Sequence, residues 1–170
     1  MKYAFKKDCH MIGLILSIIV FNLVAFQTNK RLSKNQMIHV WAFTIVLQMA
    51  FDGFVDHKYH GYWYFSNEIE FIDVLTVTVL VPPVNIMFLN WFPFQFGAVK
   101  KVLYFLVWYI IIVFYEVLAL LPEPWGYFHY GWWKLKYSML IDPILLMILI
   151  VYYKWIVKVE NEVRSESQSS

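Results

Sequence analysis

Long runs of apolar residues alternate with short polar connections along the chain. Within each run the apolar residues are continuous rather than alternating with polar ones, which favours helices over half-buried strands. A helix needs about 20 mostly apolar residues to cross the hydrocarbon core of a bilayer, and its backbone must satisfy its hydrogen bonds internally. The pattern therefore predicts an all-α, polytopic membrane helix bundle with five transmembrane helices. The predicted spans run from about His10 to Phe26, Met37 to Val55, Ile69 to Trp91, Val102 to Leu121 and Tyr137 to Val157.

Prolines occur within two of these spans. The tandem Pro82-Pro83 removes two amide donors near the middle of the third span, which predicts a kink there. Asn85 is the expected hydrogen-bond donor to the carbonyls that these prolines leave free. Asp142-Pro143 fits an N-cap followed by proline at the first helical position, so the regular part of the fifth helix is expected to begin at Pro143.

The composition supports a membrane class. Apolar residues make up 61% of the chain and charged residues 15%, against about 45–50% and about 25% in soluble domains. A chain of 170 residues has no room for a separate soluble domain beside five spans, so residues 1–159 are predicted to form one membrane domain. Residues 160–170 are polar and serine-rich, and a disordered tail is expected there. The net charge of +2 gives no reason to expect nucleic acid as a partner.

Two further features concern targeting. The first span ends without a small-x-small cleavage pattern, so it is interpreted as a retained span rather than a signal peptide. Five spans place the two termini on opposite sides of the membrane, and eight basic residues lie on the side of the C-terminus against six on the other. The positive-inside rule then favours a multi-pass protein of the cell membrane with a cytoplasmic C-terminus.

The same topology brings nearly all acidic and histidine side chains outside the tail to one membrane face. The end of the second span, the start of the third, the end of the fourth and the start of the fifth share this face with the N-terminus. The residues that it gathers are Cys9, His10, Asp52, Asp56, His57, His60, Glu68, Glu70, Asp73, Glu116, Glu123, His129 and Asp142.

Carboxyls inside apolar sequence are costly in a bilayer, so they normally face the bundle interior and have partners. We therefore expect carboxyls of the second to fifth spans to meet in one hollow near this face, with aromatic side chains around its rim. Structural hydrogen bonds between helices are the alternative for the acids, and an interfacial aromatic belt is the alternative for the aromatic side chains. The predicted ligand-binding residues are Asp52, Asp73, Asn85, Glu116, Asp142, Trp63, Trp125 and Trp132.

A repeat of polar residues also raises metal binding. Gln48, Asp52, Asp56 and His60 recur every four residues, so they would share one stripe if the second helix continued to His60. Carboxylates and imidazoles in such an arrangement can bind a divalent metal or pass protons. A solvated helix end is the alternative. The candidate metal ligands are Asp56, His57, His60 and His129.

Three diffuse sequence features lie between about Met37 and Val157. They are an aspartate at the end of the second span (Asp52), a glutamate late in the fourth (Glu116), and Tyr127…Trp132-Trp133-Lys134 before the fifth. In these features the chain resembles an uncharacterised family of small five-span integral membrane proteins from endospore-forming Gram-positive bacteria. The resemblance implies a bacterial cell membrane and an association with spores, and it transfers no functional residues.

Three hypotheses for function follow. The first is a non-enzymatic membrane protein that binds a small ligand or ion at the acid-rich face, either in transport or as a subunit of a larger membrane complex. The second is a membrane-embedded, metal-dependent enzyme acting on a lipid or envelope precursor, with Glu116 as acid and base. The third is a structural or assembly protein. Partners expected under all three are the lipid bilayer and further copies of the chain or other membrane subunits.

Overall fold

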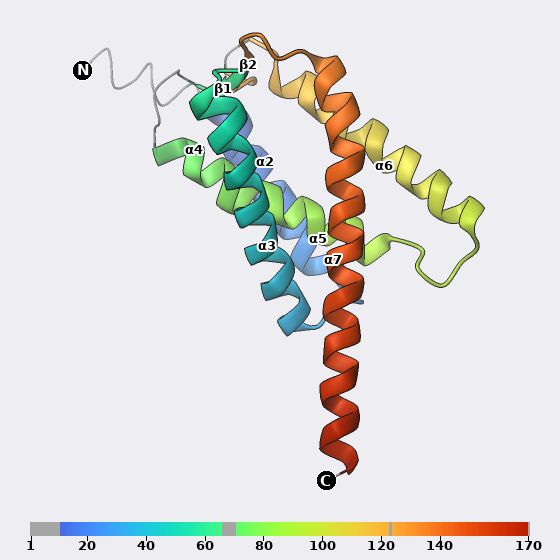
Figure 1. The fold of residues 1–170 in the computed structure, drawn as a ribbon. Coiled ribbons are helices and arrows are strands. Elements are labelled where there is room, and N and C mark those ends of the chain that lie inside the picture. The colour runs from blue at the N-terminus through green and yellow to red at the C-terminus, as the bar shows by residue number, and fades with distance from the viewer. Residues whose placement is uncertain (1–10, 66–70, 123, 170) are drawn as a thin grey trace.

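The computed structural model describes residues 11–65, 71–122 and 124–169 of the chain. Cys9, His10, Glu68, Glu70 and Glu123 of the predicted acid-rich face lie outside these residues, as does the side chain of His57. The described chain is mostly helical (Figure 1). Its elements are α2 (Ile12–Thr28), α3 (Lys34–Asp52), the π-helix η1 (Gly53–Lys58), β1 (Tyr62–Tyr64), α4 (Phe71–Leu75), the π-helix η2 (Thr76–Leu80), α5 (Val81–Trp91), α6 (Ala98–Ala119), β2 (Phe128–Tyr130) and α7 (Leu135–Ser169).

Four helical segments of the described chain are long and apolar enough to cross a membrane. They are Lys34–Asp56, Ile72–Trp91, Ala98–Ala119 and Leu135–Gln168, and each coincides with one of the predicted spans. The fifth predicted span corresponds to α2, a shorter apolar helix of 17 residues. The predicted class of a membrane-compatible helix bundle is thus confirmed, with four spans of sufficient length among the described residues.

Prolines inside the helices leave some backbone carbonyls without their usual amide donor. Side chains of other helices donate hydrogen bonds to these carbonyls instead. Pro82 and Pro83 stand in the first turn of α5, directly after the π-helical η2. They cannot donate to the carbonyls four residues earlier, on Thr78 and Val79. These two carbonyls accept instead from Trp41 Nε1 of α3 at 3.0 Å and from an α2 amide, at 2.9 Å.

That α2 amide belongs to Asn22. The predicted donor, Asn85, bonds Thr44 Oγ1 at 3.0 Å instead, so this part of the prediction was wrong. The carbonyls freed by the tandem prolines thereby bond η2, the segment just before α5, to both α2 and α3.

A third proline shows the same arrangement in α7. This helix begins at Leu135 and continues through Pro143, so the predicted start of the helix at Pro143 was wrong. The carbonyl of Met139, four residues before Pro143, accepts from the Tyr109 hydroxyl of α6 at 3.2 Å. The structure also continues α7 to Ser169, where the sequence predicted a disordered tail.

The aromatic connections form a small sheet at one end of the bundle (Figure 1). Strands β1 and β2 pair antiparallel, with Tyr62 opposite Tyr130 and Tyr64 opposite Phe128. Two glycines allow the backbone to approach this sheet closely. A Cβ on Gly131 would overlap the carbonyl oxygen of His60, and one on Gly126 would overlap the backbone of the chain just after α6. The all-α prediction missed these two three-residue strands.

Helix α2 is bonded to both ends of the bundle. At its start the Gly13 amide donates to the Pro124 carbonyl, beside the sheet, at 3.3 Å. At its end the Thr28 carbonyl accepts from Asn90 Nδ2 of α5 at 2.9 Å. The helix therefore extends along the same thickness of the bundle as its neighbours.

The helices differ in how far they are enclosed. We compare the buried share of the most apolar 18 residues in each span. It is 56% in the segment formed by α4, η2 and α5, but 11% in α6. Helix α6 slants away from α7 toward its N-terminal end (Figure 1). Its outward face is apolar and exposed, as at Val107, Ile110 and Phe114.

Candidate ligand pocket

The described acidic side chains outside residues 160–170 gather at the end of the bundle that carries the sheet, as predicted, but they line two cavities. Asp52, Asp56 and Asp73 line a cavity of about 120 Å³ between α3, η1 and the start of the third span. Glu116 and Asp142 line a second cavity, of about 200 Å³. The expectation that acids of all four spans meet in one hollow was therefore wrong.

Strand β1 forms the wall between the two cavities. Tyr64 lines both of them, and Tyr62 lines the cavity of Glu116 while its hydroxyl donates to Asp52 on the other side. Burial raises the pKa of both tyrosine hydroxyls well above their usual range, so they stay protonated at neutral pH. A buried, protonated hydroxyl is a suitable donor to a carboxylate.

The cavity of Asp52, Asp56 and Asp73, here called the aspartate cavity, is built into the fold. All three carboxyl side chains are buried. Asp52 accepts from Gln48 Nε2 at 2.9 Å, one helical turn earlier, as well as from Tyr62. These contacts hold the end of the second span against β1, which matches the structural alternative considered for these acids.

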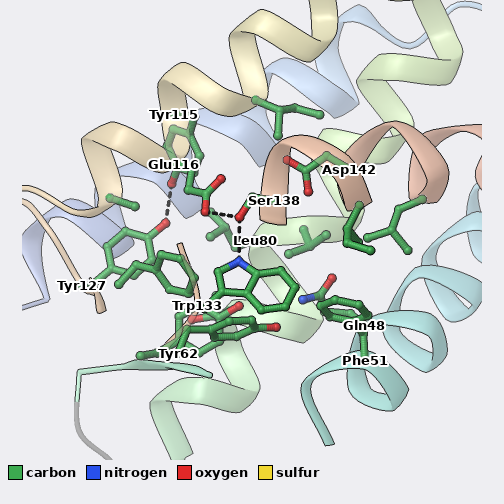
Figure 2. Close-up of a pocket in the computed structure, with 18 residues that line it drawn as sticks. Gln48, Phe51, Tyr62, Leu80, Tyr115, Glu116, Tyr127, Trp133, Ser138 and Asp142 are labelled. Carbon is green, nitrogen blue, oxygen red and sulfur yellow. Dashed lines mark hydrogen bonds between the residues drawn. The ribbon is translucent and has the colours of Figure 1, made fainter. Parts of the chain in front are cut away.

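The cavity of Glu116 and Asp142, here called the glutamate cavity, carries a directed hydrogen-bond chain (Figure 2). The indole N–H of Trp133 donates to Ser138 Oγ at 2.9 Å. Ser138 Oγ in turn donates to Glu116 Oε1, which also accepts from the Tyr130 hydroxyl at 2.6 Å. The carboxyl of Glu116 is thus fixed in place by β2, by α7 and by the segment between them.

Burial also affects the tyrosine hydroxyls near Glu116. It raises the pKa of Tyr130, and the hydrogen bond to Glu116 adds to that rise. Burial likewise raises the pKa of Tyr127, whose hydroxyl shares a hydrogen bond of 2.6 Å with Tyr115. The hydroxyl groups around Glu116 are therefore neutral at physiological pH.

The charged residues that line the glutamate cavity are all acidic. Asp142 of α7 lines the same cavity as Glu116, and none of the described lysine, arginine or histidine residues lines it. Neither carboxyl forms an ion pair with any residue that the structure describes. Both side chains are half-buried, so they remain within reach of a ligand.

Aromatic side chains make up much of the remaining lining. Seven of them face the cavity: Phe51, Tyr62, Tyr64, Tyr115, Tyr127, Phe128 and Trp133. Five of the seven lie in the connections that also carry the predicted Trp63, Trp125 and Trp132: Tyr62, Tyr64, Tyr127, Phe128 and Trp133. Trp63 stacks on His129, Trp125 is 56% exposed, and Trp132 is 50% exposed and donates to the Tyr59 carbonyl at 2.7 Å.

None of those three tryptophans lines either acidic cavity. The structure does not place them at these cavities, so their role in ligand binding stays a prediction. The exposure of Trp125 and Trp132 matches the alternative of an interfacial aromatic belt. The aromatic residues that do line the glutamate cavity could not be told from their neighbours by composition alone.

A third, apolar cavity of about 250 Å³ adjoins the glutamate cavity. Gln48, Tyr115 and Asp142 are among the residues that line both. Asn85, a predicted ligand residue, lines this apolar cavity together with its hydrogen-bond partner Thr44.

The predicted metal set is not assembled among the described residues. The helical stripe ends because α3 gives way to the π-helix η1, and His60 lies beyond it, exposed and with a left-handed backbone (φ 50°). His129 stacks against Trp63 with a ring separation of 6.3 Å. No three histidine, cysteine or acidic residues in the described ranges are grouped to hold a metal ion, and the side chain of His57 lies outside those ranges.

No protein-family model, curated protein or solved structure matches the chain. The resemblance to five-span proteins of spore-forming bacteria stays a prediction.

Proposed function

We propose that this chain is a multi-pass membrane protein that binds a small organic cation in the glutamate cavity. The observation that carries the proposal is the pairing of two carboxyls, Glu116 and Asp142, in a cavity that no described basic residue lines. Two like charges in one low-dielectric site repel each other, and a bound cation offsets both the repulsion and the cost of burial.

The aromatic lining favours an organic cation over a bare metal ion. Faces of tyrosine and tryptophan rings attract cations, most strongly where water is excluded, and this is how proteins recognise quaternary ammonium groups. The hydroxyls near Glu116 are neutral donors that orient its carboxylate without neutralising it. A small ammonium compound would therefore meet charge on one side and rings on the others.

The setting that we propose is the bacterial cell membrane, with α2 as a fifth span and the C-terminus in the cytoplasm. At about 1.5 Å per residue, the 17 residues of α2 extend about 26 Å, near the lower limit for a crossing helix. Its hydrogen bonds to both ends of the bundle support a crossing. The exposed apolar face of α6 would then face lipid or a further copy of the chain.

The test is a binding measurement on the full chain in lipid nanodiscs. Tetramethylammonium is titrated into the protein, and tert-butyl alcohol serves as an uncharged probe of similar size. We expect the ammonium ion alone to bind. Glu116→Gln, which keeps the shape of the side chain, should lower its affinity about 10-fold or more, because it removes a charge from a poorly screened site.

The matched control is Glu162→Gln, which removes a 59% exposed carboxyl that pairs with Lys158 on the surface of α7. It should leave the affinity unchanged. Equal loss in both variants, or equal binding of the alcohol and the ammonium ion, would reject the proposed site.

A further inference from the structure

The apolar cavity beside the glutamate cavity is large and only partly enclosed by the protein. Native interiors contain few voids larger than a water molecule. An apolar void of about 150 Å³ stays dry and takes up apolar ligands, and this one measures about 250 Å³. Apolar matter from outside the chain would therefore fill it favourably.

Polar groups are concentrated at the end that this cavity shares with the glutamate cavity. Asp142 and Gln48 lie at the shared boundary. Farther along, Thr44 and Asn85 satisfy one another, and the rest of the lining is mainly apolar. The apolar side chains include Phe21, Val84, Met87, Ile111, Leu146 and Leu149. The two cavities together have one charged end and one apolar end.

The apolar end reaches the outside of the bundle along α6. Ile111 lines the cavity and is also 50% exposed. Its helix is the least enclosed of the four long spans, with 11% of its most apolar window buried. An alkyl chain of a molecule in the surrounding bilayer could thus enter beside Ile111 without crossing a polar surface.

We infer that the ligand is an amphiphile with a single cationic head and an alkyl chain, taken up from the bilayer. The inference rests on the proposed function, which supplies the head site at Glu116 and Asp142. The alkyl chain of the ligand occupies the apolar cavity between α3, α5, α6 and α7. A net cation is favoured over a zwitterionic phospholipid because no described basic residue lines either cavity to receive a phosphate.

The test compares two ammonium ions on the full chain in non-ionic detergent. Tetramethylammonium probes the head site alone, and dodecyltrimethylammonium, with its concentration expressed as mole fraction in the micelle, probes head and chain together. Val84→Phe fills the apolar cavity from α5, and Ile111→Phe does so from a half-exposed position that tolerates a larger side chain. Val107→Phe, at a 50% exposed site on α6 that lines neither cavity, is the matched control.

We expect each filling variant to lower the affinity for dodecyltrimethylammonium about 10-fold, since about two buried methylenes lose their site. Both variants should bind tetramethylammonium like the wild type, and Val107→Phe should change neither. Dodecyltrimethylammonium affinity that is the same in all four proteins would overturn the inference and leave the proposed function standing. If neither ammonium ion bound to the wild type, both the inference and the proposed function would be overturned.

A competition arm separates the two sources of an ammonium head. Phosphatidylcholine carries the same trimethylammonium group next to a phosphate. It should not displace bound dodecyltrimethylammonium. Displacement would overturn the assignment to a phosphate-free amphiphile and identify a lipid headgroup as the occupant.

Discussion

The aspartate cavity and the glutamate cavity hold the same kind of side chain at the same end of the bundle, yet their surroundings differ. In the aspartate cavity all three carboxyls are buried, and Asp52 is bonded to its own helix and to β1. In the glutamate cavity the two carboxyls are half-buried and form no ion pair within the described chain. Acids in apolar sequence can therefore be buried and bonded within the fold or half-buried beside a cavity, depending on the residues around them.

The largest effect is expected from breaching the wall between the two cavities. Tyr64 lines both and is buried, so Tyr64→Ala removes a whole aromatic ring from that wall. Truncation of a buried aromatic side chain costs about 3–5 kcal/mol. Thermal unfolding in detergent should show a large loss of stability.

Tyr64→Phe is the control for this prediction because it retains the ring. It should remain much closer to the wild type than the alanine variant. Equal stability of Tyr64→Ala and the wild type would mean that β1 does not separate the cavities.

A smaller effect is expected from the hydroxyl that serves the aspartate cavity. Tyr62→Phe leaves buried Asp52 without one of its donors. Loss of such a partner costs about 1–3 kcal/mol, which denaturant unfolding can resolve. The affinity for tetramethylammonium should stay within about twofold, because Glu116 and Asp142 are untouched.

Tyr59→Phe provides the comparison for that variant. Its ring is 56% exposed, and exposed substitutions usually change stability by less than about 0.5 kcal/mol. If Tyr62→Phe were as stable as Tyr59→Phe, Asp52 would not depend on β1.

The sequence was sufficient for the spans but not for the sheet. Continuous apolar runs predicted every long helix, because a run of about 20 apolar residues has few other solutions. The pairing of Tyr62 with Tyr130 joins residues 68 positions apart through strands of three residues, and no periodicity reveals it. Without that pairing the acids of both cavities could only be assigned to one face.

The prolines are a second case in which contacts between distant residues could not be predicted from the sequence. The sequence identified Pro82-Pro83 as missing amide donors and interpreted Pro143 as a helix start. It could not show that Trp41, Asn22 and Tyr109 supply the replacements, because these lie on other helices. An internal proline was therefore interpreted as a helix start in α7, although a neighbouring hydroxyl allows the helix to continue.

The smallest effect is expected at the serine of the glutamate cavity. Ser138→Ala removes one of the two hydroxyls that Glu116 accepts from. One hydrogen bond contributes about 1 kcal/mol, so the affinity for tetramethylammonium should change by no more than about fivefold. Titration calorimetry can measure this change, and a complete loss of binding would give Ser138 a larger part than orienting Glu116.

The most direct test of the account is to locate the bound cation. Solid-state NMR on the protein in lipid, with ¹³C-labelled tetramethylammonium, reports which side chains lie near its methyl groups. We predict contacts to the Glu116 carboxyl carbon and to the Trp133 ring, at the distance of about 6 Å or less that cation–ring contacts require. Contacts to Asp52 and Asp73 in place of Glu116 would contradict the assignment of the two cavities.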